Sequence, residues 1–304
     1  MTEPWAYLNG EWLPASRTAL SLTDAGFILG AAVAEQIRTF RGKLFRLEDH
    51  LDRLWRSLAI VGIDPGLSRQ EMAGIAEELV RRNYALEDPA NDLGVSVFVT
   101  PGLYPGYSPP TPTTPTVGLH TYRLPFRLWA AKYAKGQPLV TPAIEQVSPR
   151  CWPPQLKCRS RMHYYLADRE AAALDPEARA LLLTSEGWVA EASTANIIVV
   201  FGTKRLVFPP RTRTLPGISL AVTVELARRV GLATIEADLN LGDLYGASEI
   251  LLTSTPYCLL WVCRLNSRVV GDGKPGPIFQ KLLTEWNRLV GLDIVEQARQ
   301  FADQ

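Results

Sequence analysis

The chain has 304 residues, of which 32 are basic and 31 acidic, so its formal net charge is +1. A charge this close to zero argues against a general nucleic-acid binder, which carries a basic excess. There is no run of 18 apolar residues to cross a membrane and no signal-peptide pattern at the N-terminus. The four cysteines form no CxxC pair and the three histidines are scattered, which favours reduced cytoplasmic thiols over a metal site.

The first 124 residues are expected to form one domain that contains both strands and helices. Asn9-Gly10 lies between two apolar pairs, a strong signal for a β-hairpin. A Gly-rich segment covers 24–30, and the stretch 101–115 has six prolines, which predicts a loop. Periodicity then predicts strands over 32–40, 94–100 and 116–122, and helices over 47–61 and 68–84.

A domain boundary is expected at Leu124-Pro125-Phe126, so that 125–304 forms a larger second domain. One helix is expected to end at Gly231, a favourable residue after a helix C-terminus. The expected strands are 181–184, 188–190, 196–201 and 249–253, and the expected helices are 161–174, 218–230 and one beginning at 278. The fold class is therefore α+β in two domains.

Lys157 is one of only seven lysines, and it lies between apolar residues and two arginines. Burial and positive neighbours both lower the pKa of a lysine, and a neutral amine can form a Schiff base with a carbonyl. A solvated basic cluster is the alternative that these residues alone favour.

Glu191 lies between two apolar strands, where a carboxylate is costly unless it meets a partner. A protonated pyridine nitrogen would be a suitable positive partner. A glutamate on a solvent-facing edge is an equally good interpretation of these residues alone.

Three further features could bind phosphate. Thr214–Ser219 precedes a predicted helix, whose N-terminal N–H groups attract anions, although such residues also cap ordinary helices. Thr253-Ser254-Thr255 supplies hydroxyls at a strand end, or forms only a turn. Arg53, in the first predicted helix, offers a guanidinium that could form a fork on a phosphate or a solvated ion pair.

In this order, these features resemble the fold-type IV (class IV) pyridoxal-phosphate aminotransferases, which include branched-chain and D-amino-acid aminotransferases and aminodeoxychorismate lyase. The resemblance spans nearly the whole chain and is carried by residues 7–12, 24–30, 44–54, 191–196, 215–218 and the strand ending at Thr255. It implies a smaller α/β N-terminal domain, a larger pseudo-barrel domain, pyridoxal 5'-phosphate (PLP) as cofactor and a homodimer.

The resemblance also implies roles for individual residues. Lys157 matches the Schiff-base lysine, which also moves a proton at the substrate Cα, and Glu191 matches the acid that faces the pyridine nitrogen. The remaining cofactor positions are the phosphate ligands Arg53, Ile218, Ser219 and Thr255, the ring contact Leu215, and Arg161 in place of a tyrosine near the phenolic oxygen.

On the substrate side, the family pocket is lined by one face of the strand that carries Ala34, Gln36 and Arg38. Branched-chain enzymes have an aromatic residue where Ala34 stands and glycine where Gln36 stands, so this pocket is expected to be wider and more polar. Pro256 has no N–H to offer a substrate carboxylate.

The resemblance implies transfer of an amino group from an amino acid to a 2-oxo acid, as in the branched-chain aminotransferases. The alternatives are aminodeoxychorismate lyase, a D-amino-acid transaminase or a non-catalytic descendant. The sequence leaves the donor, its stereochemistry and the oligomer size open.

Overall fold

The computed structural model describes residues 3–107 and 114–303. Contacts divide the chain into two units. Unit 1 comprises Met1–Leu124 and Leu156–Ser160, and unit 2 comprises Pro125–Gln155 and Arg161–Gln304. The units separate after Leu124, where the sequence suggested a boundary, but the segment 156–160 belongs to unit 1 although it was expected in the second domain. The proline-rich loop expected over 101–115 lies partly outside the described residues.

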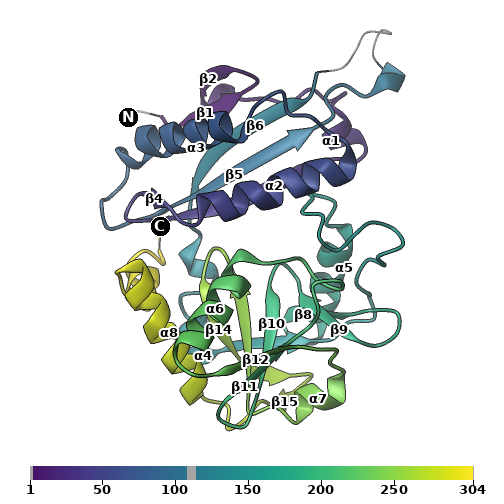
Figure 1. Cartoon of the computed structure of the whole chain (residues 1–304), viewed down its shortest axis with the longest axis vertical. Coiled ribbons are helices and arrows are strands. Elements are labelled where there is room, and N and C mark those ends of the chain that lie inside the picture. Colours follow the sequence, from purple (N-terminus) through teal and green to yellow (C-terminus); the bar gives the residue numbers. More distant parts are fainter. Residues whose placement is uncertain (1–2, 108–113, 304) are drawn as a thin grey trace. The chain divides into compact units, whose positions relative to one another are not determined.

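Unit 1 is built on a six-stranded antiparallel sheet (Figure 1). The expected hairpin forms at Asn9-Gly10, where both residues take positive φ angles (48° and 92°) as the tight turn requires. In spatial order the strands are β2 (Glu11–Pro14), β1 (Trp5–Leu8), β6 (Thr116–Arg123), β5 (Leu93–Thr100), β3 (Val33–Phe40) and β4 (Lys43–Leu44).

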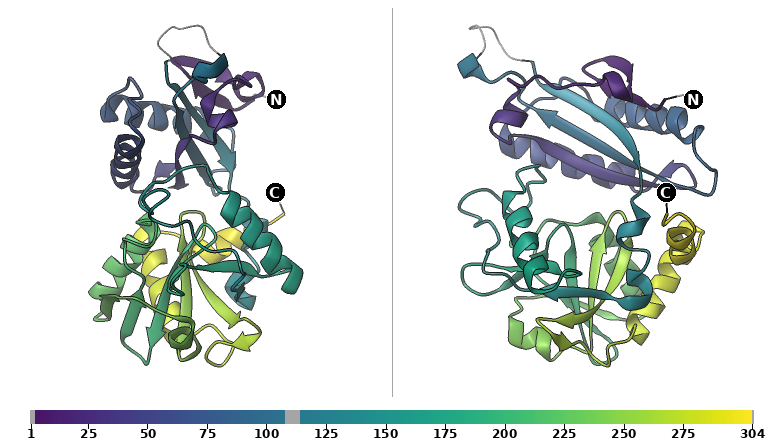
Figure 2. Two further views of the ribbon diagram at one scale, coloured as in Figure 1. Left: turned by 90° about the vertical axis from the view of Figure 1, so that its right-hand side faces the viewer. Right: turned by 180° about the vertical axis from the view of Figure 1, so that it is seen from behind.

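Two helices, α2 (Leu47–Val61) and α3 (Arg69–Tyr84), cover one face of this sheet (Figure 2). The apolar residues of α2 recur at helical spacing, so Leu51, Leu54 and Leu58 are buried against the strands. A capping box between Ser68 and Glu71 begins α3. The short helix α1 (Ala25–Ile28) forms within the segment expected only to be Gly-rich.

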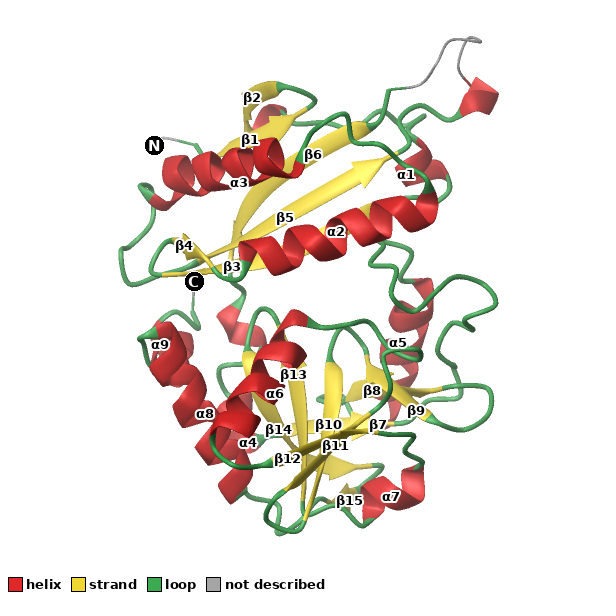
Figure 3. Cartoon of the chain, viewed as in Figure 1, coloured by secondary structure: helices red, strands yellow, loops and turns green. Residues whose placement is uncertain are grey.

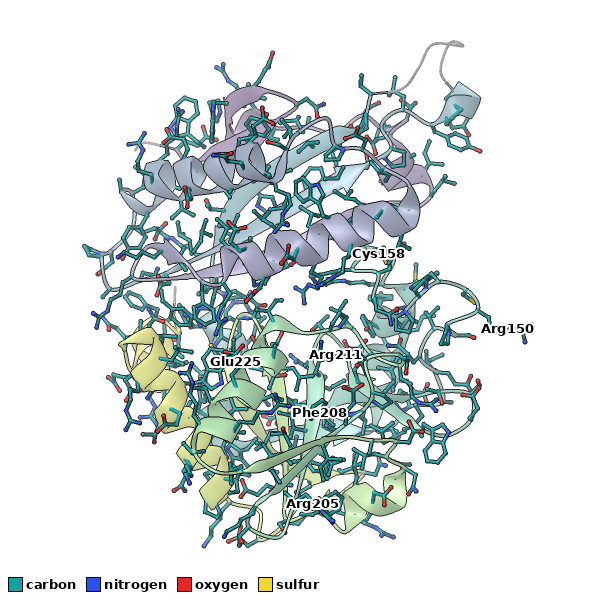
Figure 4. All side chains as sticks on the ribbon, viewed as in Figure 1. Arg150, Cys158, Arg205, Phe208, Arg211 and Glu225 are labelled. Atoms are coloured by element: carbon teal, nitrogen blue, oxygen red, sulfur yellow. The ribbon has the colours of Figure 1, made fainter. Side chains whose placement is uncertain are left out.

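The segment 156–160 lies along the free side of the first half of β3. The Ala34 N–H donates to the Lys157 carbonyl at 3.0 Å, and the Arg159 N–H donates to the Ala32 carbonyl at 2.8 Å. The Lys157 N–H donates to Ser57 Oγ of α2 at 3.1 Å. Figure 4 labels Cys158 in this segment, next to α2. Backbone hydrogen bonds therefore attach Lys157 to unit 1.

Unit 2 is built on a mixed nine-stranded sheet that follows the order β12-β11-β10-β13-β14-β7-β8-β9, with β15 paired to β14. Contacts between β9 and β10 curl the sheet back on itself, in agreement with the expected pseudo-barrel. The strands are β7 (Gln137–Val140), β8 (Arg179–Leu183), β9 (Val189–Ala192), β10 (Asn196–Phe201), β11 (Arg205–Phe208), β12 (Ala233–Glu236), β13 (Glu249–Ser254), β14 (Cys258–Leu265) and β15 (Arg268–Val269).

Helices pack on this sheet, with α6 (Ile218–Arg229) and α8 (Pro277–Val290) together against β13 and β14 and α5 (Met162–Leu174) against β7 and β8 (Figure 3). The Trp286 indole N–H of α8 donates to Thr223 Oγ1 of α6 at 3.0 Å, which fixes how the two helices meet. The helices are α4 (Lys132–Lys135), α5 (Met162–Leu174), α6 (Ile218–Arg229), α7 (Leu241–Tyr245), α8 (Pro277–Val290) and α9 (Ile294–Gln300). None of the helices in the described part of the chain is both long and apolar enough to cross a bilayer.

Candidate active site

Lys157 lies beside the start of β3 with its side chain largely buried, at 9% exposure. Val33 pairs antiparallel with Cys158, so side-chain alternation puts Lys157 and Arg159 on the face of the strand that carries Ala34 and Gln36. This burial does not fit the solvated basic cluster that the neighbouring residues alone favoured.

Arg53 of α2 is buried at 2% exposure and forms an ion pair with Glu35 of β3, a residue that no sequence motif singled out. Arg53 Nε donates to Glu35 Oε1 at 2.7 Å and Nη2 donates to Oε2 at 2.8 Å. His50 Nδ1 lies 2.8 Å from the same Oε2. The solvated ion pair considered for Arg53 is therefore wrong, because both members are inside unit 1.

The charges of this cluster shift two pKa values. Burial alone would raise the pKa of Glu35, but the charge and hydrogen bonds of Arg53 outweigh burial and hold it well below its usual range. Burial lowers the pKa of His50, and the charges of Arg53 and Lys157 add to that effect. Of the two shifted groups, only His50 is affected by the charge of Lys157.

The three residues expected to line the substrate pocket differ in accessibility. Ala34 is fully buried, and the Gln36 amide donates to Ser96 Oγ at 2.8 Å. Arg38 is 1% exposed and its guanidinium lies 4.0 Å above the centre of the Phe40 ring. A substrate role for these residues stays a prediction.

In unit 2, Glu191 is buried at 4% exposure, so the edge position considered for it is wrong. Its Oε1 accepts hydrogen bonds from Gln146 Nε2 at 2.8 Å and from the Tyr164 hydroxyl at 2.7 Å. Its Oε2 accepts from Asn196 Nδ2 at 3.2 Å. These three donors are neutral side chains, so they orient the carboxylate without cancelling its charge.

Tyr164 contacts Glu191, although no motif in the sequence singled it out. Burial, followed by the charge of Glu191, raises the pKa of Tyr164 well above its usual value, so its hydroxyl stays protonated and can donate. Arg161, at the N-terminus of α5, opposes this rise. Burial lowers the pKa of His163, and the charge of Arg161 lowers it further. The expected position of Arg161 near the phenolic oxygen of the cofactor stays a prediction.

Asn196 connects Glu191 to the expected phosphate site. Its Nδ2 also donates at 2.8 Å to the carbonyl of Leu215, three residues before the start of α6. A Cβ on Gly217 would lie 1.9 Å from Asn196 Oδ1, so only glycine lets the chain approach Asn196 this closely. Glu191, Leu215 and Gly217 therefore converge on one amide side chain.

The N-terminus of α6 is suited to an anion. Among the described residues no side chain caps this end, although Ile218 and Ser219 are buried there. Thr253, which pairs with Asn196 across β10 and β13, has a buried hydroxyl for which the described residues provide no partner. Thr255 follows at the end of β13. These groups fit a phosphorylated ring whose nitrogen faces Glu191.

The described residues contain no group of three His, Cys, Asp or Glu side chains that could hold a metal ion. The groups that the structure does provide are the Lys157 amine, the Glu191 carboxylate and the N–H groups of α6. Within unit 2, the Glu191 carboxylate and the N–H groups of α6 suit an organic group that carries a ring nitrogen and a phosphate, and within unit 1 the Lys157 amine suits an aldehyde.

Residues 32–265, well over half of the chain, match a family model described as "Amino-transferase class IV". The chain belongs to this family. It is therefore an aminotransferase of the class that works with PLP.

Relatives of two kinds are similar to the chain. A Methanocaldococcus jannaschii protein assigned as a branched-chain-amino-acid aminotransferase is 29% identical over 279 residues, covering 91% of this chain and 93% of the relative. The D-alanine aminotransferase of Bacillus licheniformis is 28% identical over 277 residues, covering 91% of this chain and 93% of the relative.

The fold is also similar to that of solved structures. A T.th. branched-chain amino acid aminotransferase, solved with N-(5'-phosphopyridoxyl)-L-glutamate, matches with a TM-score of 0.85 at 23% identity, covering 96% of this chain and 95% of that one. The expected two-domain fold of type IV is confirmed.

Proposed function

We propose that this aminotransferase moves an amino group from an amino acid to a 2-oxo acid, with PLP held by the residues described above. The relatives act on branched-chain amino acids or on D-alanine according to their names, and we propose the branched-chain-like activity. The observation that carries the cofactor assignment is the buried Glu191 joined through Asn196 to the uncapped end of α6.

PLP, when bound, supplies an electron sink for negative charge that develops at the substrate Cα. Glu191, oriented by Tyr164 and Asn196, would hold a proton on the pyridine nitrogen. The N–H groups at the start of α6, the Thr255 hydroxyl and Arg53 would bind the phosphate, and Leu215 would pack on the ring. Lys157 would bind the cofactor covalently and, once released, move the proton at Cα.

The cofactor proposal is tested by adding PLP to the purified protein, reducing with borohydride and locating the adduct by mass spectrometry. We expect visible absorbance with the wild type and a reduced adduct on Lys157. Lys157→Ala should lose both, whereas Lys204→Ala, at an exposed turn, should keep both. A wild-type protein that takes up no PLP would contradict the proposal.

The reaction is tested with amino acids of both hands against pyruvate and 2-oxoglutarate. Transfer of the amino group with a branched-chain donor supports the proposed activity. Release of pyruvate from aminodeoxychorismate without amino transfer would instead identify the lyase.

We also propose that the enzyme is a cytoplasmic homodimer. Large apolar side chains are exposed on unit 1 around α1 and the segment beside it, where the Tyr104 N–H donates to the Thr23 carbonyl at 2.7 Å. The exposed residues are Leu22 (77%), Phe27 (68%), Leu29 (60%), Leu103 (43%) and Tyr107 (69%). Such patches mark protein interfaces. Sedimentation of the wild-type protein should give a dimer, and the substitution Phe27→Glu should dissociate it. A wild-type protein that sediments as a monomer would contradict the proposed homodimer.

A further inference from the structure

A second functional group lies on the same face of unit 1 as Lys157. Arg159 follows two residues later, and the pairing of this segment with β3 directs both side chains to the face of Ala34 and Gln36. Unlike Lys157, the Arg159 side chain is exposed. The Arg159 guanidinium therefore lies on the same face of unit 1 as the candidate amine of Lys157.

Neighbouring strands fix the position of this guanidinium. Arg159 Nη2 donates to Ser96 Oγ of β5 at 2.6 Å, and Ser96 is 1% exposed. Ser96 pairs with Gln36 across the sheet, and Gln36 Nε2 donates to the same oxygen at 2.8 Å. Because two donors converge on one buried hydroxyl oxygen, the guanidinium has a defined anchor.

Tyr122 of β6 completes the arrangement. Its hydroxyl donates to Gln36 Oε1 at 2.7 Å. Gly94 makes this contact sterically feasible, because a Cβ at that position would lie 2.2 Å from Tyr122 Cζ. The ring therefore crosses over β5 to reach Gln36. The result is one directed chain of hydrogen bonds from Tyr122 through Gln36 to Ser96, joined there by Arg159.

An amino-acid substrate brings at least one carboxylate, and the planar guanidinium is the side chain best suited to bind it through two parallel hydrogen bonds. The register of β3 also places the guanidinium of Arg38 on this face, but Arg38 is buried over Phe40. Arg159 is exposed and anchored by Ser96, which is the arrangement that a carboxylate ligand requires.

We propose that Arg159, positioned by Ser96, binds a carboxylate of the amino-acid substrate. The inference rests on the proposed function for the identity of the substrate. Arg159 binds and orients the substrate, while Ser96 acts through Arg159 as a positioning residue.

The test is steady-state kinetics of the PLP-loaded enzyme with Arg159→Gln and Arg159→Lys. Loss of a charge-assisted contact is expected to raise KM for the amino acid by about 10- to 100-fold while kcat changes much less. Arg159→Lys should recover part of the loss, and Ser96→Ala should show a smaller rise in KM. Arg150→Gln, at an exposed position (Figure 4), is the matched control and should leave KM unchanged.

The choice of substrates distinguishes the two carboxylates. If Arg159 binds the α-carboxylate, KM should rise equally for leucine and glutamate, and a primary amine without a carboxylate should be unaffected. If it binds a side-chain carboxylate, only glutamate should be affected. Either result supports the proposal. An Arg159→Gln variant with wild-type KM for both amino acids would overturn it.

Binding of glutarate by calorimetry gives a readout independent of turnover. Wild type should bind this dicarboxylate and Arg159→Gln should bind it at least about tenfold more weakly. Equal binding by both proteins would overturn the inference. A wild type that binds glutarate but takes up no PLP would contradict the proposed function and leave the carboxylate site standing.

Discussion

Arg53 and Glu35 face each other through two hydrogen bonds of 2.7 and 2.8 Å, and both side chains are almost completely buried. The pair joins helix α2 to strand β3. His50 contacts the same carboxylate, and the charge of Lys157 reaches His50. Arg53, a candidate phosphate ligand, is thus held in place by Glu35. Glu35 lies on the face of β3 opposite to the face that carries Gln36.

Glu35→Gln is expected to destabilise the protein strongly. It removes the carboxylate charge that faces a buried guanidinium, a change that typically costs about 3–5 kcal/mol. The double substitution of Glu35→Leu with Arg53→Met should recover most of the free energy of unfolding, because no buried charge remains from the pair. Urea denaturation measures both.

Arg81→Ala, which removes an exposed partner of Glu78, is the control and should leave the unfolding midpoint nearly unchanged. Equal midpoints for Glu35→Gln and wild type would show that the buried pair does not support the fold.

Stability is expected to fall as the pH is lowered below neutrality. The folded-state pKa of His50 lies below its ordinary value of 6.5, so the unfolded chain binds the proton more readily. His50 therefore contributes stability that is present above pH 6.5 and lost as the pH falls. Glu35, whose pKa is also lowered, adds to the loss once the pH falls below its ordinary 4.5.

Urea midpoints measured between pH 7 and 5 test this, and the substitution His50→Asn should flatten the profile. The substitution His163→Asn should flatten it less, because the side chain of His163 is only partly buried. A His50→Asn profile as steep as that of wild type would refute the assignment.

Tyr164→Phe should weaken both the fold and cofactor binding. It deletes a hydrogen bond to the buried Glu191 carboxylate, a contact of the kind worth about 1.5–3 kcal/mol, and leaves that carboxylate less well oriented. Urea denaturation and PLP titration measure the two effects. Tyr165→Phe changes a neighbouring ring that is 61% exposed and should alter neither. Identical behaviour of the two variants would contradict the role of Tyr164.

Gly276→Ala should destabilise unit 2. Glu249 accepts hydrogen bonds from the Ile278 and Phe279 N–H groups at 2.8 Å each and so caps α8. A Cβ on Gly276 would lie 2.1 Å from the Cδ atom of Glu249. Displacing this cap is expected to cost about 1–2 kcal/mol. A Cβ on Gly74, within α3, meets nothing within 4 Å, so Gly74→Ala should stabilise by up to about 1 kcal/mol. Thermal unfolding of both should show shifts of opposite sign.

Local pattern alone determined much of the fold. The Asn9-Gly10 hairpin and the bounds of the helix over 47–61 agree with the structure, because turn chemistry and helical periodicity act over a few residues. Strand β14, Cys258–Leu265, was not predicted, since its apolar residues run consecutively and lack the alternation of a half-buried strand. The short elements α7, β11 and β12 were also missed.

The ordered motifs were enough to indicate the family and the candidate roles of Lys157 and Glu191. Tertiary structure alone decided which side chains support them. Tyr164 and Glu191 form a hydrogen bond although they are 27 residues apart in the sequence, and Arg159 and Ser96 do so although they are 63 residues apart. Such contacts depend on strand register and on how helices pack, and no local pattern encodes the distance between residues so far apart in the chain. For the same reason, only the structure shows that residues 156–160 belong to unit 1.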